Sequence, residues 1–264
     1  MTVLLIGAGR MGAALLKGWR TKGLKNILVV EPKASAEVKK FAKTKAIALY
    51  AASSQVKAKR IDACVVALKP QVLKGEAASL AAIAQGGALM LSIAAGTSIA
   101  ALQQAWGKKA RIIRAMPNTP GAIGAGITGL YAAKGTTAAD KKRAGALLSV
   151  LGETLWVNRE ELIDSVTALS GSGPAYVFHL VEAMAAAGVA AGLRPVEAEK
   201  LARATVAGSG ALLTADKSSA AQLREAVTSP GGTTAAALSV LMPELTGLMT
   251  RAIAAAKKRA EELR

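Results

Sequence analysis

Six residues near the start of the chain, Gly7-Ala8-Gly9-Arg10-Met11-Gly12, constrain its fold more than any other feature. They follow a short apolar segment, residues 3–6, and open a helical pattern over residues 11–22. At a strand-to-helix turn this spacing is typical of a dinucleotide-binding loop. The first glycine permits the turn, the second lets the backbone approach a pyrophosphate, and the third allows close helix–strand packing. The alternative is a glycine-rich turn without a ligand.

The first 158 residues alternate between predicted strands and predicted helices. Strands are expected at residues 3–6, 27–30, 46–49, 63–68, 88–93, 111–115, 126–131 and 153–157. Helices are expected at residues 11–22, 35–42, 70–84, 98–105 and 138–151. This alternation predicts an α/β fold with a doubly wound, mainly parallel sheet, as in Rossmann-like domains.

The rest of the chain, residues 159–264, has helical patterns only. Helices are expected at residues 160–169, 175–188, 195–214, 219–227, 233–241 and 242–262. We therefore predict a dinucleotide-binding domain over residues 1–158 and an all-helical domain over residues 159–264. The helix at 175–188 is apolar around most of its circumference and must be enclosed on nearly all sides. This predicts an obligate homodimer held through the helical half.

A second glycine motif, Ser229-Pro230-Gly231-Gly232-Thr233-Thr234, precedes the helix at 233–241. The N–H groups of a helix N-terminus attract a carboxylate or phosphate. The alternative is a simple turn followed by a threonine N-cap. A nucleotide loop at one end and an anion site near the other predict a redox enzyme that acts on a small acid.

The residues after the second predicted strand leave the choice between NAD and NADP open. Glu31 is placed to hold a ribose 2′-hydroxyl, which favours NAD. Lys33 and Ser35, with Arg10 in reach, are placed to hold a 2′-phosphate instead. Ligands bind outside the carboxyl ends of parallel strands. The residues after two further strands are therefore expected cofactor contacts: Ala67, Leu68, Lys69, Pro70 and Ala94.

The net charge of +17 raises the possibility of a nucleic-acid partner. However, the cations are dispersed in short groups such as Lys39-Lys40, and aromatic residues make up only 3% of the chain, which leaves few rings to stack on bases. Our main expectation is therefore that the protein has no nucleic-acid partner. A basic nucleic-acid binder is the alternative.

Glycine and charge interrupt every apolar run, so we expect no membrane span. The single cysteine, Cys64, lies in the apolar run 63–68 and is expected to be buried. The cysteine count and the absence of a signal-peptide pattern predict a cytoplasmic location. We expect no metal site.

The order and spacing of six motifs resemble those of the pyrroline-5-carboxylate reductase family along essentially the whole chain. The motifs in the first half are the glycine loop, Ala67-Leu68-Lys69-Pro70-Gln71, Ser92-Ile93-Ala94-Ala95-Gly96, and Arg114-Ala115-Met116-Pro117-Asn118-Thr119-Pro120. Those in the second half are Leu169-Ser170-Gly171-Ser172-Gly173-Pro174-Ala175-Tyr176 and Ser229-Pro230-Gly231-Gly232-Thr233-Thr234.

This resemblance implies a Rossmann-like domain followed by an all-helical domain of an intertwined dimer, with dimers often assembled into a ring. It implies reduction of a cyclic imino acid, L-1-pyrroline-5-carboxylate, to L-proline by hydride from NADPH or NADH.

The resemblance also assigns roles to residues. Gly7, Ala8, Gly9, Arg10, Met11 and Gly12 match the pyrophosphate loop, and Ala67, Lys69 and Pro70 match the segment under the nicotinamide and its ribose. Ser54 stands where the family often has an asparagine that contacts the cofactor. Thr234 matches the hydroxyl beside the imine nitrogen, which makes it the expected catalytic residue. The substrate-binding loop comprises Ser229, Gly231, Gly232, Thr233 and Thr234.

Two further enzyme classes remain as alternatives: another cyclic-imine reductase and the 3-hydroxyacid dehydrogenases. The 3-hydroxyacid dehydrogenases have the motif G-x-x-G-x-G-x-x-x-K at the start of the helical domain. In this chain Val177 occupies the position of the lysine. Alcohol oxidation would lack its proton acceptor, which favours imine reduction. A nucleotide-binding regulator is a non-enzymatic alternative. We expect His179, the single histidine, to be packed or to face another helix rather than to act as a proton donor.

Overall fold

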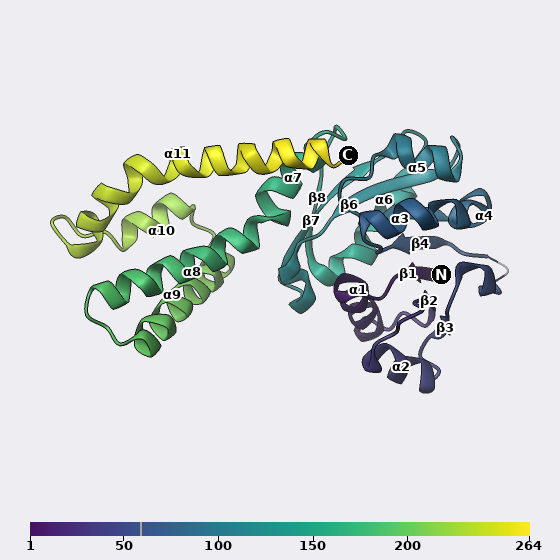
Figure 1. Ribbon diagram of the computed structural model, residues 1–264, viewed down its shortest axis with the longest axis horizontal. Coiled ribbons are helices and arrows are strands. Elements are labelled where there is room, and N and C mark those ends of the chain that lie inside the picture. The colour runs from purple at the N-terminus through teal and green to yellow at the C-terminus, as the bar shows by residue number, and fades with distance from the viewer. Residues whose placement is uncertain (59) are drawn as a thin grey trace. The chain divides into compact units, whose positions relative to one another are not determined.

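The protein is described by a computed structural model that covers residues 1–58 and 60–264. Figure 1 labels its elements. The chain has two compact units. The first comprises Met1–Gly171 with Ala256–Arg264, and the second comprises Ser172–Ala255. The domain boundary at residue 158 stays a prediction.

An eight-stranded sheet forms the centre of the first unit, in the order β3-β2-β1-β4-β5-β6-β7-β8. All neighbouring strands are parallel except β6 and β7. The strands are β1 Thr2–Ile6, β2 Asn26–Val30, β3 Ala48–Tyr50, β4 Ala63–Val66, β5 Leu89–Ser92, β6 Arg111–Met116, β7 Gly126–Ala132 and β8 Gly152–Trp156. Because β2 and β3 lie on one side of β1 and β4 on the other, the strand order reverses beside β1. The predicted doubly wound, mainly parallel fold is confirmed.

Helices pack on both faces of this sheet. They are α1 Arg10–Thr21, α2 Ala36–Lys43, α3 Pro70–Glu76, α4 Ala81–Gln85, α5 Ile99–Trp106, α6 Ala138–Leu148 and α7 Leu162–Val166. Successive residues of β1 point to opposite faces. Val3 and Leu5 join the core that contains α1 and α6, whereas Leu4 and Ile6 join the core that contains α3, α4 and α5.

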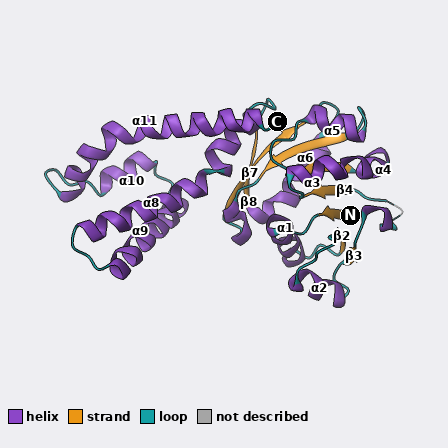
Figure 2. Ribbon diagram, in the orientation of Figure 1, coloured by secondary structure: helices purple, strands orange, loops and turns teal. Residues whose placement is uncertain are grey.

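The second unit contains only helices and loops, as Figure 2 shows. Its helices are α8 Gly173–Ala190, α9 Pro195–Ala215, α10 Ala220–Ala226 and most of α11, Thr233–Glu262. Helices α8 and α9 pack closely at Gly188, where an added Cβ would lie 3.1 Å from the Cβ of Ala198. In the described part of the chain, no helix combines the length and apolar character that a membrane-spanning helix needs.

Helix α8 has no buried residue in the single chain. Five of its large apolar side chains are exposed by more than a third: Val177 46%, Phe178 61%, Leu180 49%, Met184 36% and Val189 42%. A soluble monomer rarely leaves so much contiguous apolar surface in water. This face therefore needs a covering that the single chain does not supply.

The predicted helix at residues 70–84 is interrupted, which corrects the sequence expectation. Helices α3 and α4 are separated by a 3-10 turn, Ala77–Leu80. The indole nitrogen of Trp106 donates a hydrogen bond of 2.9 Å to the carbonyl oxygen of Ala77. That carbonyl thus has a partner outside its own helix, a contact that no local pattern reveals.

The predicted helix at residues 160–169 is also shorter than expected. It runs only over Leu162–Val166 and continues as a wider π turn, Thr167–Gly171. Within this segment the hydroxyl of Thr167 donates to the carbonyl of Ile163 at 2.7 Å, and the hydroxyl of Ser170 to that of Val166 at 3.1 Å. Such side-chain bonds to the preceding turn compete with the regular backbone pattern.

The two predicted helices at 233–241 and 242–262 form one helix, α11, with Pro243 inside it. A proline in a helix interior removes one backbone hydrogen bond and costs about 3 kcal/mol. The residues on both sides of Pro243 form regular helix, including the alanine-rich stretch at residues 252–256, so the single interruption does not end it.

The final residues, Ala256–Arg264, are part of the first unit and pack against its other elements. Ala260 is buried, and an added Cβ at Gly96 would lie 2.7 Å from the carbonyl oxygen of Leu263. A guanidinium nitrogen of Arg264 lies 3.3 Å from a carboxylate oxygen of Asp164. These contacts hold the end of α11 beside the loop that follows β5.

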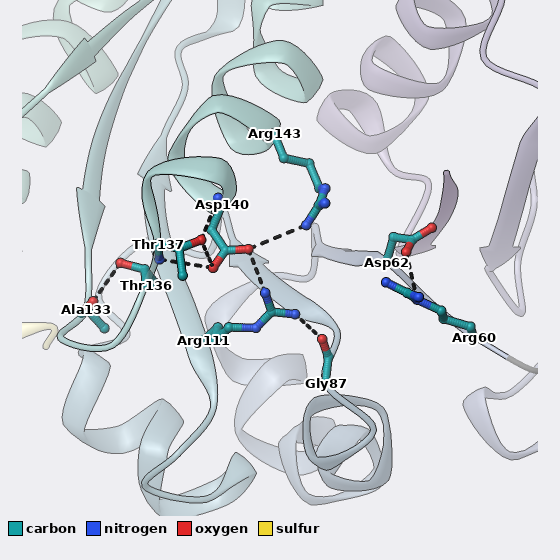
Figure 3. Close-up of polar contacts among 9 residues, drawn as sticks. All are labelled: Arg60, Asp62, Gly87, Arg111, Ala133, Thr136, Thr137, Asp140 and Arg143. Atoms are coloured by element: carbon teal, nitrogen blue, oxygen red, sulfur yellow. Dashed lines mark hydrogen bonds and ion pairs between the residues drawn. The ribbon is translucent and has the colours of Figure 1, made fainter.

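A buried carboxylate fixes α6 against the sheet, as Figure 3 shows. Asp140 caps the start of α6 by accepting hydrogen bonds from the backbone and hydroxyl of Thr137 at 3.1 and 2.9 Å. It also pairs with Arg111 of β6 at 2.7 Å and with Arg143 at 3.4 Å. Burial raises the pKa of Asp140, but the bonds from Thr137 and the charge of Arg111 outweigh this effect and hold the pKa below its usual value.

Candidate cofactor and substrate site

The glycine loop between β1 and α1 has the geometry of a nucleotide cradle. Gly7 has φ +88°, a conformation that other residues rarely adopt. A Cβ at Gly12 would lie 2.2 Å from the carbonyl oxygen of Gly7, so only glycine fits there. A Cβ at Gly9 would meet nothing within 4 Å. Gly9 therefore faces open space that a side chain would fill.

A cavity of about 360 Å³ lies at the carboxyl ends of the first four strands. Six of the predicted cofactor residues line it: Gly7, Gly9, Glu31, Ala67, Leu68 and Lys69. The cavity thus spans the point where the strand order reverses, which is where open α/β sheets bind ligands. An extended nucleotide laid across Gly9 fits this arrangement, because the backbone there carries no side chain to obstruct it.

Glu31 occupies the end of β2 and connects it to the glycine loop. Its Oε2 atom accepts a hydrogen bond of 2.8 Å from the backbone N–H of Ala8, and its Oε1 atom accepts one of 3.0 Å from that of Lys33. Both carboxylate oxygens are therefore held by backbone donors. The side chain is partly exposed and lines the cavity.

The other nine predicted cofactor residues do not line this cavity. Lys33 is exposed, and the hydroxyl of Ser35 caps α2 by accepting from the N–H of Val38 at 3.4 Å. Ala94 is buried after β5. Ser54 is exposed on a 3-10 turn, Ser53–Gln55. The remaining five residues are Ala8, Arg10, Met11 and Gly12 around the start of α1, and Pro70 at the start of α3.

Sequence reasoning missed three polar residues that line the same cavity: Ser53, Glu76 and Ser79. The hydroxyl of Ser53 lies 3.2 Å from that of Ser79, which donates to the carbonyl of Glu76 at 2.8 Å. Ser53 directly precedes Ser54, so the prediction of Ser54 as a cofactor contact already indicated this segment of the chain. Glu76 and Ser79 fall in a segment predicted as one helix, and they are spaced four and seven residues after Val72, which also lines the cavity. This spacing puts the three residues on one helical face, which was the available signal.

The second glycine motif forms the expected helix start. Gly231 has φ +71°, and the N–H of Gly232 donates to the carbonyl of Ser229 at 3.0 Å. Helix α11 begins at Thr233, and its first backbone bond runs from Ala236 to the carbonyl of Gly232 at 3.1 Å. The first N–H groups of a helix have no partner within it. They are the groups that can hold a carboxylate, and they belong to the second unit.

The two remaining candidate residues differ in outcome. Cys64 is fully buried in β4, as predicted, and burial raises the pKa of its thiol. His179 is not packed within the single chain, because its side chain is 80% exposed and its Nδ1 lies 3.0 Å from Glu182, and the expectation that it faces another helix stays a prediction. The reason is the uncovered face of α8. No cluster of three or more metal-ligating side chains occurs within residues 1–58 and 60–264.

Comparison with known proteins gives similarity over the whole chain. Residues 160–263 match the family described as "Pyrroline-5-carboxylate reductase dimerisation", and residues 2–96 match "NADP oxidoreductase coenzyme F420-dependent". A pyrroline-5-carboxylate reductase of Pseudomonas aeruginosa is 38% identical over 263 residues, covering 99% of this chain and 96% of the relative.

Two solved structures have the same fold. One is a pyrroline-5-carboxylate reductase from Coxiella burnetii, with a TM-score of 0.92 and 34% identity over 99% of this chain and 98% of that one. The other is a Plasmodium falciparum pyrroline carboxylate reductase with NADP bound, with a TM-score of 0.82 and 26% identity over 100% of this chain and 98% of that one.

Proposed function

The chain belongs to the pyrroline-5-carboxylate reductase family, and on this basis we propose that it reduces L-1-pyrroline-5-carboxylate to L-proline with NADPH or NADH. The observation that carries the proposal is the open space over Gly9 at the point where the strand order reverses. It supports a bound dinucleotide in a chain that is 38% identical to a reductase of this name.

The proposed cofactor site consists of the glycine loop and the ends of β2, β4 and β5. The loop comprises Gly7, Ala8, Gly9, Arg10, Met11 and Gly12, and its backbone would hold the pyrophosphate. Glu31, Lys33, Ser35 and Ser54 would surround the adenosine, and Ala67, Leu68, Lys69, Pro70 and Ala94 would lie toward the nicotinamide. A bound nicotinamide would supply the hydride.

The proposed substrate site is the start of α11. The loop that contains Ser229, Gly231, Gly232 and Thr233 would receive the substrate carboxylate, which the first backbone N–H groups of α11 would hold. The hydroxyl of Thr234 would orient the imine nitrogen. A protonated imine is already electrophilic, so the chain need not supply a strong general acid. Residues that position the imine carbon and exclude water are sufficient for hydride transfer.

We further propose that the functional form is a homodimer, with dimers assembled into a ring. The exposed apolar face of α8 supports a helical interface, because obligate interfaces resemble a domain core cut in half. We also propose a cytoplasmic location, which the single unpaired cysteine supports.

The test is loss of NADH or NADPH absorbance on addition of L-1-pyrroline-5-carboxylate, with L-proline identified as the product. Parallel assays with other cyclic imines, and with 3-hydroxyacids plus the oxidised cofactors, separate the two alternative enzyme classes. We expect turnover of the first substrate and none of 3-hydroxyacids. Binding of dinucleotide without turnover of any of these compounds would contradict the proposal and favour a nucleotide-binding regulator.

A further inference from the structure

We propose that Glu31 makes this protein prefer NADH to NADPH. The inference rests on the proposed cofactor site and deepens it, because the two cofactors differ only at the 2′ position of the adenosine ribose. In dinucleotide-binding folds of this type, the residue at the end of the second strand meets that position. Glu31 follows β2 directly and lines the cavity there.

The carboxylate of Glu31 is fixed by two backbone donors. Ala8 donates to one oxygen at 2.8 Å and Lys33 to the other at 3.0 Å. Moving this side chain aside to admit a phosphate would break both hydrogen bonds. An ionised carboxylate only accepts hydrogen bonds, so it matches the donor hydroxyl of an unphosphorylated ribose. It offers nothing to a phosphate oxygen.

The charge of the cavity also favours NADH over NADPH. Among the described residues that line it, two are carboxylates, Glu31 and Glu76, and one is a cation, Lys69. Lys69 follows β4 rather than β2. A 2′-phosphate brings a charge of about −1.5 to −2 at neutral pH. Although the chain carries a net charge of +17, the described lining residues at the end of β2 include no cation that could receive that charge.

The residues that would favour NADPH lie outside the cavity lining. Lys33 and Ser35 are exposed residues that do not line the cavity, and the hydroxyl of Ser35 accepts from Val38 at the start of α2. Arg10 opens α1 and is exposed outside the cavity lining. Arg10 is the cation whose movement would oppose the proposal, and the experiment addresses it.

The test is equilibrium binding to the intact protein, measured by calorimetry without substrate. The probes are NADH and NADPH, together with 5′-AMP and adenosine 2′,5′-bisphosphate, which carry the 2′ difference alone. From the repulsion between a carboxylate and a nearby phosphate, we expect the 2′-phosphorylated member of each pair to bind about tenfold more weakly, or worse. The difference should shrink as salt is raised.

Three variants test whether Glu31 causes the preference for NADH. Glu31→Ser should shift the NADPH-to-NADH affinity ratio toward NADPH by about tenfold, and Glu31→Gln, which keeps the shape, should give part of that shift. Glu37→Ser is the matched control, because Glu37 is exposed on α2 outside the cavity and its loss changes the net charge equally. The control should leave the ratio unchanged.

Equal or tighter binding of NADPH to the wild-type protein would overturn the proposal, and Arg10→Ala would then show whether that cation holds the phosphate. An unchanged ratio in a folded Glu31→Ser variant would also overturn it. If the variants do not fold, the wild-type comparison of 5′-AMP with the bisphosphate still decides. Failure of both dinucleotides to bind would instead remove the proposed cofactor site itself.

Discussion

The guanidinium of Arg114 pairs with the carboxylate of Glu160 at 2.6 Å, with side chains only 3% and 19% exposed. The same Glu160 oxygen accepts a 2.7 Å hydrogen bond from the backbone N–H of Ile99, the first residue of α5. A carboxylate at a helix N-terminus is favourably placed for the helix dipole. This one side chain therefore joins β6, the start of α5 and the segment after β8.

Removing Arg114 should destabilise the protein strongly. Arg114→Met leaves Glu160 without its buried partner, and breaking such a pair costs about 3–5 kcal/mol. The free energy of unfolding, measured by urea denaturation, reports this loss. Arg203→Met is the control, since Arg203 is 75% exposed and pairs with Glu199 at 3.4 Å, and it should cost at most about 1 kcal/mol. Similar small costs for both variants would show that the buried pair adds little.

Two glycine substitutions in the same loop should have different effects: one should lower dinucleotide affinity alone, and the other should lower both affinity and stability. Gly9→Ala introduces a methyl group into open space, so the melting temperature should change little while dinucleotide affinity falls. Gly12→Ala places a Cβ 2.2 Å from the carbonyl of Gly7, so both stability and affinity should fall. Thermal unfolding and calorimetric titration separate these outcomes. Unchanged NADH and NADPH affinity in Gly9→Ala would place the pyrophosphate elsewhere.

Thr234→Ala should lower kcat/KM for the imine while leaving cofactor affinity nearly unchanged. Loss of a hydrogen bond to a charged group corresponds to roughly 1.5–3 kcal/mol of transition-state stabilisation. Thr234→Ser should restore most of the activity, since it keeps the hydroxyl. Thr246→Ala, an exposed position on the same helix, is the control. Wild-type turnover by Thr234→Ala would exclude Thr234 from the site.

The ion-pair cluster around Asp140 should give stability that depends on pH. Because its pKa is lowered in the folded protein, Asp140 contributes stability above the unfolded pKa of about 3.9. That contribution is lost as the pH falls through the lower, folded value. Asp140→Asn should therefore cost roughly 2–3 kcal/mol near neutral pH, and the difference from wild type should shrink below about pH 4. Denaturation curves across this range provide the measurement, and a constant difference would contradict the assignment.

The exposed face of α8 should mediate self-association. Phe178→Glu places a charge on this face, where Phe178 is 61% exposed, and should weaken the dimer by at least about tenfold because a buried unpaired charge is costly. Ile123→Glu, which alters an 84% exposed residue of the first unit, should not. Sedimentation equilibrium at micromolar protein measures both. A wild-type protein that sediments as a fully active monomer would refute the dimer.

Local patterns were sufficient for the architecture. The strand at β1, the glycine spacing after it and the alternation of strands with helices predicted a doubly wound sheet, and the motifs Ser92-Ile93-Ala94-Ala95-Gly96 and those in the second half predicted the family. These features depend on residues close in sequence, because backbone sterics and the periodicity of apolar side chains determine helices, strands and turns locally. The recognition of the pyrroline-5-carboxylate reductase family is confirmed by the relatives.

Tertiary contacts decided what the sequence left open. In the break after α3, the carbonyl oxygen of Ala77 accepts a hydrogen bond from the indole of Trp106, which comes from α5, and no local pattern could indicate this contact. The role of Glu31 depends on Ala8, which lies 23 residues earlier, because only folding brings the end of β2 beside the glycine loop. Sequence determines which groups a chain carries and the periods in which they repeat. Which donor meets which carboxylate is set by packing between elements that are distant along the chain.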